Sequence, residues 1–406
     1  MRTRLLAVIG VASAVVVVAT FMKPGTVAVS GQTAAAPSAA SAAGTAGAPR
    51  TPWGEPDLQG IWTNEFDTPL QRASRYGTRE FFTEEERAEL DEQRLALLGR
   101  DRRVERGTEL DVAGAYNSVF MSMKRTGRRT SLIVDPPDGR VPPLVPEATQ
   151  RAAADREFRV ALLQATETCR NNSPACAGGK YVATPSSRRN EVLARYNTAR
   201  MNRHDGPEDG SLSDRCLSGG IPEFGTAYGG SFRRIVQSPG GISIFYDVGQ
   251  GQGFQRNIVM SGSPHLPASV RQWHGDSRGR WEGDTLIVDV TNFSAKTDFM
   301  GSRENLHLVE RWTRTGADTL EYAVTIEDPS VWPRPWTVKE EFTKQSEKEN
   351  RIYYEPRCHE GNYGFPSLLL AARLADKAYA EGHGPHPATK DNATDFVGVE
   401  ENPLAR

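Results

Sequence analysis

The sequence lacks the residues and motifs that identify most enzyme classes. Its 406 residues include only four cysteines and seven histidines. It has no G-x-S-x-G nucleophile elbow, no H-E-x-x-H zinc motif, no P-loop and no G-x-G-x-x-G between a strand and a helix. These absences exclude many standard hydrolases, metalloproteases and nucleotide-dependent enzymes. They leave open the enzymes that need no cofactor.

Neither sign of charge dominates the chain. Lys and Arg number 49 and Asp and Glu 51, which gives a net charge of −2. Residues 1–50 contain no acidic residue and four basic ones, so residues 51–406 hold 45 basic and 51 acidic residues, a net charge of −6. A mildly acidic folded part gives no electrostatic basis for a nucleic-acid partner. The composition, 25% charged and 38% hydrophobic, is typical of a globular protein and excludes a polytopic membrane protein.

Residues 1–30 have the pattern of an export signal. Arg2 and Arg4 precede an apolar run from Leu5 to Phe21, and residues 28–30 (AVS) offer small side chains for cleavage. The run is at the short limit for a membrane-spanning helix, so an uncleaved N-terminal anchor is the alternative. Residues 31–50, rich in Ala, Ser and Gly, form a flexible linker. We expect a periplasmic or extracellular protein without stable membrane insertion after cleavage.

Export also bears on the cysteines. An even number in an oxidising compartment favours two disulfides over free thiols. Four cysteines allow three pairings. Cys169 and Cys176 enclose a short loop in which a local bridge is easy, and that bridge would leave Cys216 to pair with Cys358. The alternative is a metal site, although the sequence contains no C-x-x-C pair.

The second half of the chain alternates apolar and polar residues with period two. Counting these segments gives about eight antiparallel strands at meander spacing: 232–237, 242–248, 255–260, 281–293, 306–313, 319–328, 336–343 and 351–355. This spacing predicts a barrel or a sandwich. Earlier in the chain we expect short strands at 56–63 and 130–134, and we expect helices at 82–98, 146–168 and 367–380.

Several stretches together resemble a family of uncharacterised exported bacterial proteins. They are PDLQGIWT (56–63), RTSLIVDPPDGR (129–140), RCLSG (215–219), RQWHGDSRGRWEGDT (271–285), LHLVER (306–311) and CHEGNY (358–363). The resemblance spans nearly all of residues 51–376 and implies no particular reaction. Gly60-Ile61-Trp62 is also similar to the G-x-W of lipocalin first strands. We therefore predict a single, mainly β domain over 51–380. It is a lipocalin-like antiparallel barrel with a helical insertion at 82–230 and a C-terminal helix, followed by a polar tail, 381–406.

Two facing strands carry the first candidate residues. Period two places His307 and Arg311 on one face of the strand 306–313, opposite Leu308, and places Asp289 on the mixed face of the strand 285–291. An imidazole exchanges protons near neutral pH, so His307 is a candidate catalytic residue. Arg311 and Asp289 are candidates for substrate binding. The structural alternative is an exposed cross-strand charge pair.

The segment Cys358–Tyr363 crowds five kinds of reactive or polar side chain together. His359 and Glu360 are candidates for an acid–base pair, and Asn362 and Tyr363 for substrate contacts. The structural alternative makes Cys358 half of a disulfide and uses the polar residues to cap the following helix. A divalent metal held by His307, His359 and Glu360 is a further possibility, but no spacing requires it. We predict no metal and no cofactor.

Three further residues complete the predicted site. Asp276 follows Gly275 in a loop and is a candidate to orient a catalytic histidine. Arg129 precedes a strand and is a candidate anion ligand, with a surface charge as the alternative. Trp336 is a candidate wall for a flat apolar ligand, with packing under the helices as the alternative.

These residues favour an exported, cofactor-independent enzyme. It would be a lyase, isomerase or hydrolase that uses histidine and carboxylate groups as acid and base on a small, partly apolar organic molecule in a barrel cavity. One alternative is a lipocalin-like protein that binds such a small-molecule ligand without turnover. The other is a structural protein of the cell envelope with its polar groups on the surface.

Overall fold

The computed structural model describes residues 49–97, 124–224, 232–249, 252–346 and 358–393. The predicted export signal at 1–30, nearly all of the linker at 31–50, the strand at 351–355 and the end of the polar tail lie outside the described residues. Among the described helices, none has both the length and the apolar character needed to cross a membrane.

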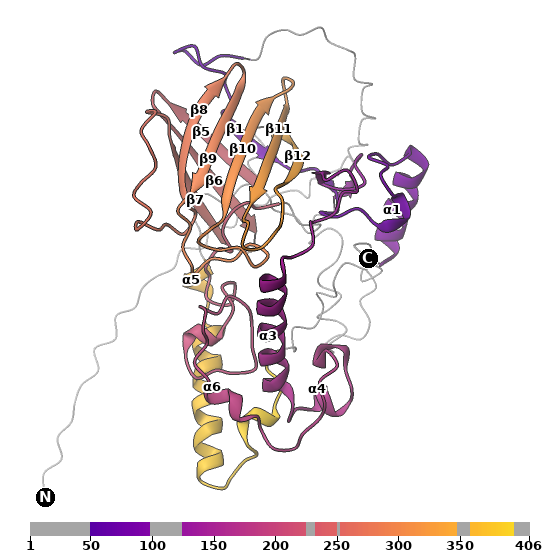
Figure 1. Ribbon diagram of the computed structural model, residues 1–406, viewed down its shortest axis with the longest axis vertical. Helices are drawn as coiled ribbons and strands as arrows, with labels where there is room; N and C mark the ends of the chain where they lie inside the picture. Colours follow the sequence, from indigo (N-terminus) through magenta and orange to yellow (C-terminus); the bar gives the residue numbers. More distant parts are fainter. Residues whose placement is uncertain (1–48, 98–123, 225–231, 250–251, 347–357, 394–406) are drawn as a thin grey trace, which may run out of the picture. The chain divides into compact units, whose positions relative to one another are not determined.

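Nine strands close into a barrel (Figure 1). Around the barrel they are β1 (Gly60–Thr63), β5 (Phe232–Ser238), β6 (Gly241–Gly249), β7 (Gln252–Val259), β8 (Asp276–Glu282), β9 (Thr285–Thr291), β10 (His307–Arg314), β11 (Thr319–Glu327) and β12 (Trp336–Gln345). Pairing of β1 with β12 closes the ring. The predicted mainly β barrel is confirmed. Seven of the eight expected meander strands are β5–β7 and β9–β12, the short strand expected at 56–63 is β1, and β8 is an additional strand that pairs in parallel with β7. The long connection 260–275 allows that parallel entry.

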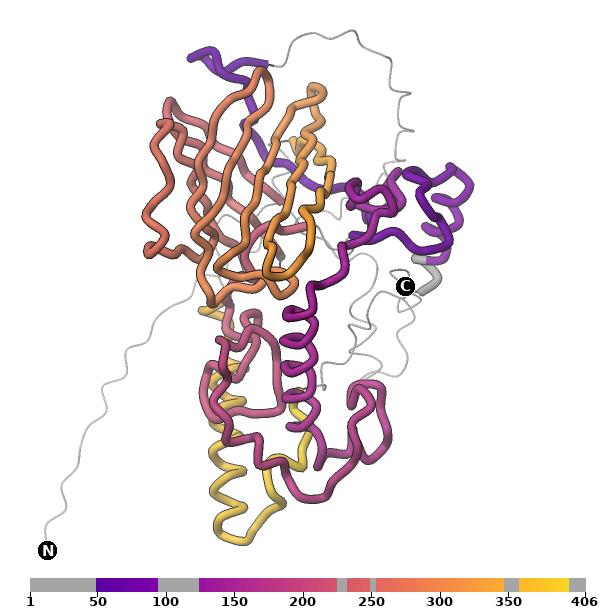
Figure 2. The backbone as a smooth tube through the Cα atoms, viewed as in Figure 1, coloured from indigo at the N-terminus to yellow at the C-terminus, as the bar shows by residue number. Residues whose placement is uncertain are grey.

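The insertion at 82–230 contains strands as well as helices. Its helices are α1 (Glu84–Leu97), α3 (Pro146–Leu163) and α4 (Glu167–Arg170), and α3 begins at a proline, which suits the first turn of a helix. Its strand β4 (Ile133–Asp135) pairs with β12, and β3 (Arg125–Thr126) pairs in parallel with β2 (Phe66–Asp67). Figure 2 follows the chain from β4 into α3. The short 3₁₀ turns are η1 (Ser74–Tyr76), η3 (Pro174–Cys176), η4 (Ser187–Asn190), η5 (Pro207–Asp209) and η6 (Pro387–Thr389).

Large side chains occupy the barrel interior. The predicted alternation holds in β10, where Leu308 and Trp312 are buried and His307 points outward. Trp62 is fully buried and its Nε1 donates to the Leu58 carbonyl at 2.8 Å. Each large apolar side chain buried in this way contributes about 1.5–3 kcal/mol of transfer free energy. The interior also buries the Arg256–Glu310 ion pair, so its lining is not purely apolar.

Trp336, predicted as a ligand wall, belongs to that core. Its side chain has 0% exposure and packs edge-on against Trp332, with ring centroids 5.5 Å apart. The alternation along β12 directs Trp336, Val338 and Phe342 inward together. This position corrects the expectation that Trp336 contacts a substrate.

The two disulfides pair as the short-loop argument suggested. Cys169 bonds to Cys176 across 7 residues, and Cys216 bonds to Cys358 across 142 residues. The second bridge joins the segment before the barrel to α5 (Cys358–Gly361), which precedes α6 (Gly364–Ala380). The start of the predicted loose tail is ordered, because Ala388 is 2% exposed and the Asn202 amide donates to the Lys390 carbonyl at 3.0 Å.

Candidate functional site

Three of the predicted residues, Asp276, Asp289 and His307, belong to one histidine–carboxylate network on the outer face of β8, β9 and β10. His265, from the loop before β8, joins them: its Nδ1 lies 2.8 Å from Asp276 Oδ2 and its Nε2 lies 2.8 Å from Asp289 Oδ1. The other Asp289 oxygen lies 3.2 Å from His307 Nε2, and His307 Nδ1 lies 3.3 Å from Glu327 Oε2. The result is a chain of alternating carboxylates and imidazoles, which we call the His–carboxylate ladder.

Strand register explains why the ladder forms. Asp289 pairs with Arg278 on one side and with Val309 on the other, and His307 pairs with Glu327. Residues paired across antiparallel strands lie on the same face, with Cβ atoms about 5 Å apart. Polar side chains on the solvent side of four neighbouring strands therefore come within hydrogen-bond distance of one another.

The loop that carries His265 is held by two hydrogen bonds at the next residue, Leu266. Its Leu266 N–H donates to Asp276 Oδ2 at 3.0 Å, and the Asn292 amide donates to the Leu266 carbonyl at 2.9 Å. Pro264 and Pro267 flank the two residues and restrict the backbone. The imidazole of His265 is thus held in one orientation between its two aspartates.

The ladder holds three carboxylates and two imidazoles, and the Arg278 guanidinium adds a positive charge at its buried end by donating to Asp276 Oδ2 at 3.0 Å. A carboxylate only accepts hydrogen bonds, so a ring nitrogen that carries a proton donates it to the carboxylate that it faces. Burial acts to raise the pKa of Asp276, but the hydrogen bonds from Leu266, Arg278 and His265 outweigh it and lower that pKa. The ladder ends at the more exposed side chains, since His307 is 34% and Glu327 45% exposed, whereas Asp276 is 5% exposed.

Arg311 lies on the same face of β10 as His307. It is exposed, and within the described part of the chain its guanidinium has no hydrogen-bond or ion-pair partner. The side chain between the two, Val309, is half-buried and apolar. Four residues along a strand span about 13 Å between Cα atoms. The outer face of β10 therefore presents three side chains in a row: the imidazole of His307, the apolar Val309 and the guanidinium of Arg311.

The predicted residues of the segment 358–363 make no described contact with the ladder. His359 and Glu360 are exposed, and Tyr363 is 79% exposed. Asn362 donates to the Asp214 carbonyl at 2.8 Å and to Cys216 Sγ at 3.3 Å, beside the Cys216–Cys358 bridge. No contact among the described residues connects this group with His307. The catalytic set of His307, His359 and Glu360 therefore stays a prediction, and Asn362 serves to anchor the disulfide-linked segment.

Arg129 is also assigned differently by the structure. Its guanidinium pairs with Glu80 and lies over the Phe81 ring, 5.1 Å from the centroid. Both contacts belong to the bridge between the segments at residues 81 and 129. These contacts tie two loops together, and the role of Arg129 as an anion ligand stays a prediction.

A serine–histidine pair forms at a second place on the barrel. Ser218 Oγ lies 2.7 Å from His274 Nε2, and Trp273 Nε1 donates to the Ser218 carbonyl at 2.9 Å. The His274 ring stacks on Phe254 with 4.1 Å between centroids. Burial, together with the charge of Arg256, lowers the pKa of His274 to about 4. So weak a base accepts a proton poorly near pH 7, and we assign the pair to holding the 211–224 segment on the barrel.

The sequence reasoning missed three members of the ladder: His265, Arg278 and Glu327. None of the three is among the candidate residues that the sequence analysis names. The available signal is the position of the two residues, because His307 begins one predicted strand and Glu327 lies near the end of the next, so they pair across the hairpin at the end away from its turn. The flanking prolines of His265 were a second signal, since they mark a loop of restricted conformation.

Within the described ranges, no group of three or more His, Cys, Asp or Glu side chains is arranged to hold a metal ion. No protein-family model matches the chain, and a search of curated proteins found no significant match.

Proposed function

We propose that the protein is an exported enzyme that uses no cofactor and transfers protons on a small, partly apolar organic molecule at the outer face of β8–β11. The single observation that supports it is the His–carboxylate ladder, in which His307 is bonded to Asp289 and Glu327 while one third of its side chain is exposed. A catalytic histidine needs an orienting carboxylate and access to substrate, and His307 has both.

In this proposal His307 is the acid–base residue and Asp289 orients it. A carbonyl or carboxylate oxygen of the substrate is held by Arg311, the apolar part lies over Val309, and the reacting end lies at His307 and Glu327. Proton transfer then takes a simple form. The Glu327 carboxylate accepts the proton from a carbon next to a carbonyl, and the His307 imidazolium gives its Nδ1 proton to that carbonyl oxygen.

The product of this step is an enol. Returning the proton to a neighbouring carbon completes an isomerisation, and loss of a leaving group completes elimination, as in a lyase. The remainder of the ladder supports the step, because Asp276 and His265 keep Asp289 bonded on its second oxygen. The substrate class is therefore a small organic acid or ketone with an apolar stretch.

The test is a screen in water labelled with deuterium and oxygen-18. The purified full chain is incubated with a panel of small keto acids, hydroxy acids, enones and esters, and mass spectrometry follows each compound. We expect deuterium uptake at carbon for isomerase or lyase activity and oxygen-18 uptake for hydrolase activity. H307Q should lower the uptake by at least about 100-fold, while H383Q, which alters an exposed histidine outside the ladder, should leave it unchanged.

Two outcomes of this screen would contradict the proposed enzyme activity. If no compound gains label, or if uptake is equal in the wild type and H307Q, the proposed enzyme activity is wrong. If a compound binds the wild type without gaining label, the protein is the non-catalytic ligand-binding protein considered from the sequence.

Export is part of the same proposal. The two disulfides in the described chain fit an oxidising compartment. Fusion of residues 1–30 to a reporter that folds only after export tests it, and retention of the reporter in the cytoplasm would contradict it.

A further inference from the structure

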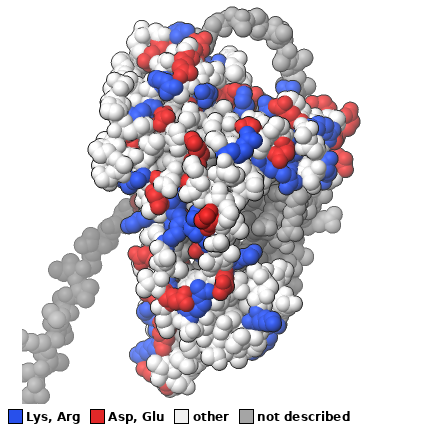
Figure 3. Space-filling view, viewed as in Figure 1, with Lys and Arg blue, Asp and Glu red and all other residues white. Residues whose placement is uncertain are grey.

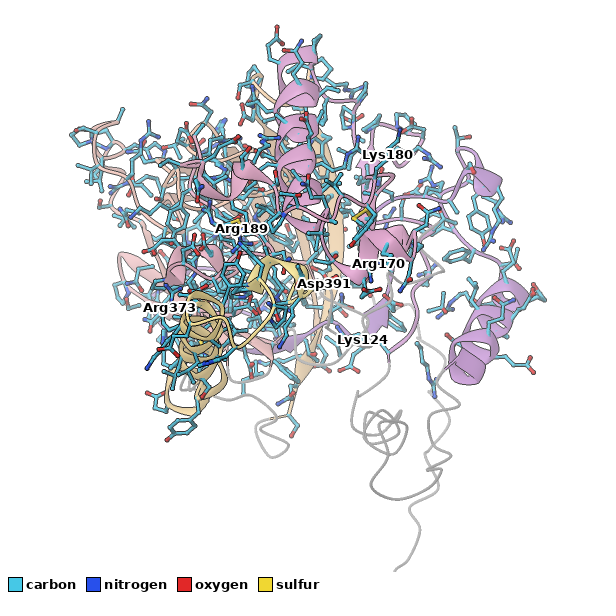
Figure 4. The ribbon with its side chains drawn as sticks, turned by 90° about the horizontal axis from the view of Figure 1, so that it is seen from below. Lys124, Arg170, Lys180, Arg189, Arg373 and Asp391 are labelled. Atoms are coloured by element: carbon cyan, nitrogen blue, oxygen red, sulfur yellow. A yellow bond between two sulfur atoms is a disulfide. The ribbon has the colours of Figure 1, made fainter. Side chains whose placement is uncertain are left out.

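A cavity of about 360 Å³ lies outside the barrel, against α6. Segments far apart in the sequence surround it: η4 and the following loop, α6, and the ordered start of the C-terminal tail. Figure 4 labels Arg189 from the first of these segments, Arg373 on α6 and Asp391 on the tail. The Arg373 guanidinium donates to the His204 carbonyl, which attaches α6 to the loop that lines the opposite wall.

One wall of the cavity is apolar. It is formed by side chains of α6 that are small apart from one leucine: Leu368, Ala371, Ala372, Ala375 and Ala378. Alanine leaves space beside a helix that a larger side chain would fill. The helix itself has no fully buried residue, so this wall is open to an occupant.

The opposite wall carries unpaired polar groups. His204 is only 9% exposed and lines the cavity, and its imidazole has no hydrogen-bond partner among the described residues. Burial, more than the opposing charges of Asp209 and Arg189, lowers the pKa of His204, so near pH 7 the ring is neutral and able to donate or accept one hydrogen bond. A ligand in the cavity can supply the hydrogen-bond partner that this largely buried imidazole lacks in the described chain.

Two cations of the lining also lack a carboxylate in the described chain. Arg189 donates to the Asn202 carbonyl at 2.8 Å and has no acidic partner, and Lys390 has none either. Of the two acidic residues of the lining, Asp376 lies 3.8 Å from Arg373 Nη1, and Asp205 lies 3.9 Å from Nε of Arg203, which lines the cavity too. The cavity therefore combines an apolar wall with three basic side chains, Arg189, Arg203 and Lys390, against two acidic ones.

We propose that this cavity binds a small amphipathic carboxylate, with the anionic group at Arg189, Lys390 and His204 and the aliphatic part along the alanines of α6. Its volume is at the small end of the range for ligand pockets and suits a chain of medium length. The site lies outside the His–carboxylate ladder, so the inference does not depend on the proposed enzyme activity.

Calorimetric titration of the purified full chain with octanoate tests the inference. Octanamide, of the same size but uncharged, measures the contribution of the carboxylate. We expect octanoate to bind at least about 10-fold more tightly than octanamide. K390Q should weaken octanoate binding about 5- to 10-fold and leave octanamide binding unchanged, and A372L should remove the binding of both by filling the cavity.

The matched control is K377Q, which changes a lysine of the same helix that does not line the cavity and should leave both affinities unchanged. Thermal unfolding of each variant verifies that the fold is retained. The inference is overturned if octanoate gives no binding at millimolar concentration, if octanamide binds as tightly as octanoate, or if K390Q and A372L bind octanoate like the wild type.

Discussion

The buried ion pair between Arg256 and Glu310 gives the sharpest quantitative prediction. The side chains are 2% and 1% exposed, Arg256 Nη1 donates to Glu310 Oε1 at 3.0 Å, and the Tyr322 hydroxyl donates to the same oxygen at 2.9 Å. R256M leaves the Glu310 carboxylate buried with one neutral donor. Loss of one partner of such a pair costs about 3–5 kcal/mol of unfolding free energy, because the remaining charge is desolvated and uncompensated.

Urea unfolding of R256M, E310M and the double variant measures this cost. Each single variant should lose about 3–5 kcal/mol, while the double variant should lie within about 1 kcal/mol of the wild type or be more stable, since methionines fill the space without a buried charge. R280M is the matched control on the barrel surface. The Arg280–Glu282 pair is 58% and 50% exposed, so its loss should cost less than about 1 kcal/mol. A loss below about 1 kcal/mol in R256M would refute this account of the core.

Two more predictions concern stability. The pKa of His274 is about 4 in the folded chain and about 6.5 when unfolded, so protonation favours the unfolded state between these values. The unfolding free energy should fall by about 3 kcal/mol as the pH drops from 7 to 4, and H274Q should flatten this part of the profile; an unchanged slope would contradict the burial of the ring. Replacing Cys216 and Cys358 by serine should cost about 5 kcal/mol, against about 2.5 kcal/mol for the short Cys169–Cys176 loop. Equal losses in denaturant titrations would argue against the loop-length explanation.

The barrel was predictable because its strands alternate with period two. That period alone predicts that Leu308 and Trp312 point inward and that His307 points outward. Strand β8 was predicted only in part, because its sequence DSRGRWE has few apolar residues and reads as a polar turn. The position of β8 depends on its pairing with β9. The composition of a single strand does not identify its pairing partner.

The candidate site was predictable only in part for the same reason. His307, Asp289 and Asp276 could be chosen from residue type and face, but the ring that connects them comes from the loop containing His265. The position of a loop side chain depends on tertiary contacts, here those of Asn292 and Asp276 with Leu266. The segment at residues 358–363 misled the sequence reasoning, because a cluster of polar types along the chain does not show where the side chains point.

The location of the cavity could not be predicted at all. Its walls come from η4, residues 202–205, α6 and the tail, and no periodic pattern connects segments so far apart. The sequence placed the ligand in the barrel, where large apolar side chains and the Arg256–Glu310 ion pair occupy the interior. Figure 3 also shows acidic and basic side chains in small, interspersed groups on the face drawn, so surface charge gives no further guide to a site there.

The most direct test of the central claim compares label uptake in two variants, using the substrate that the screen identifies. One is H307Q on the outer face of β10, and the other is the R256M/E310M double variant inside the barrel. A site on the His–carboxylate ladder predicts that H307Q loses at least about 100-fold of the deuterium or oxygen-18 uptake while the interior variant keeps wild-type activity. Full activity in H307Q, together with loss in the interior variant, would place the chemistry inside the barrel and contradict the account.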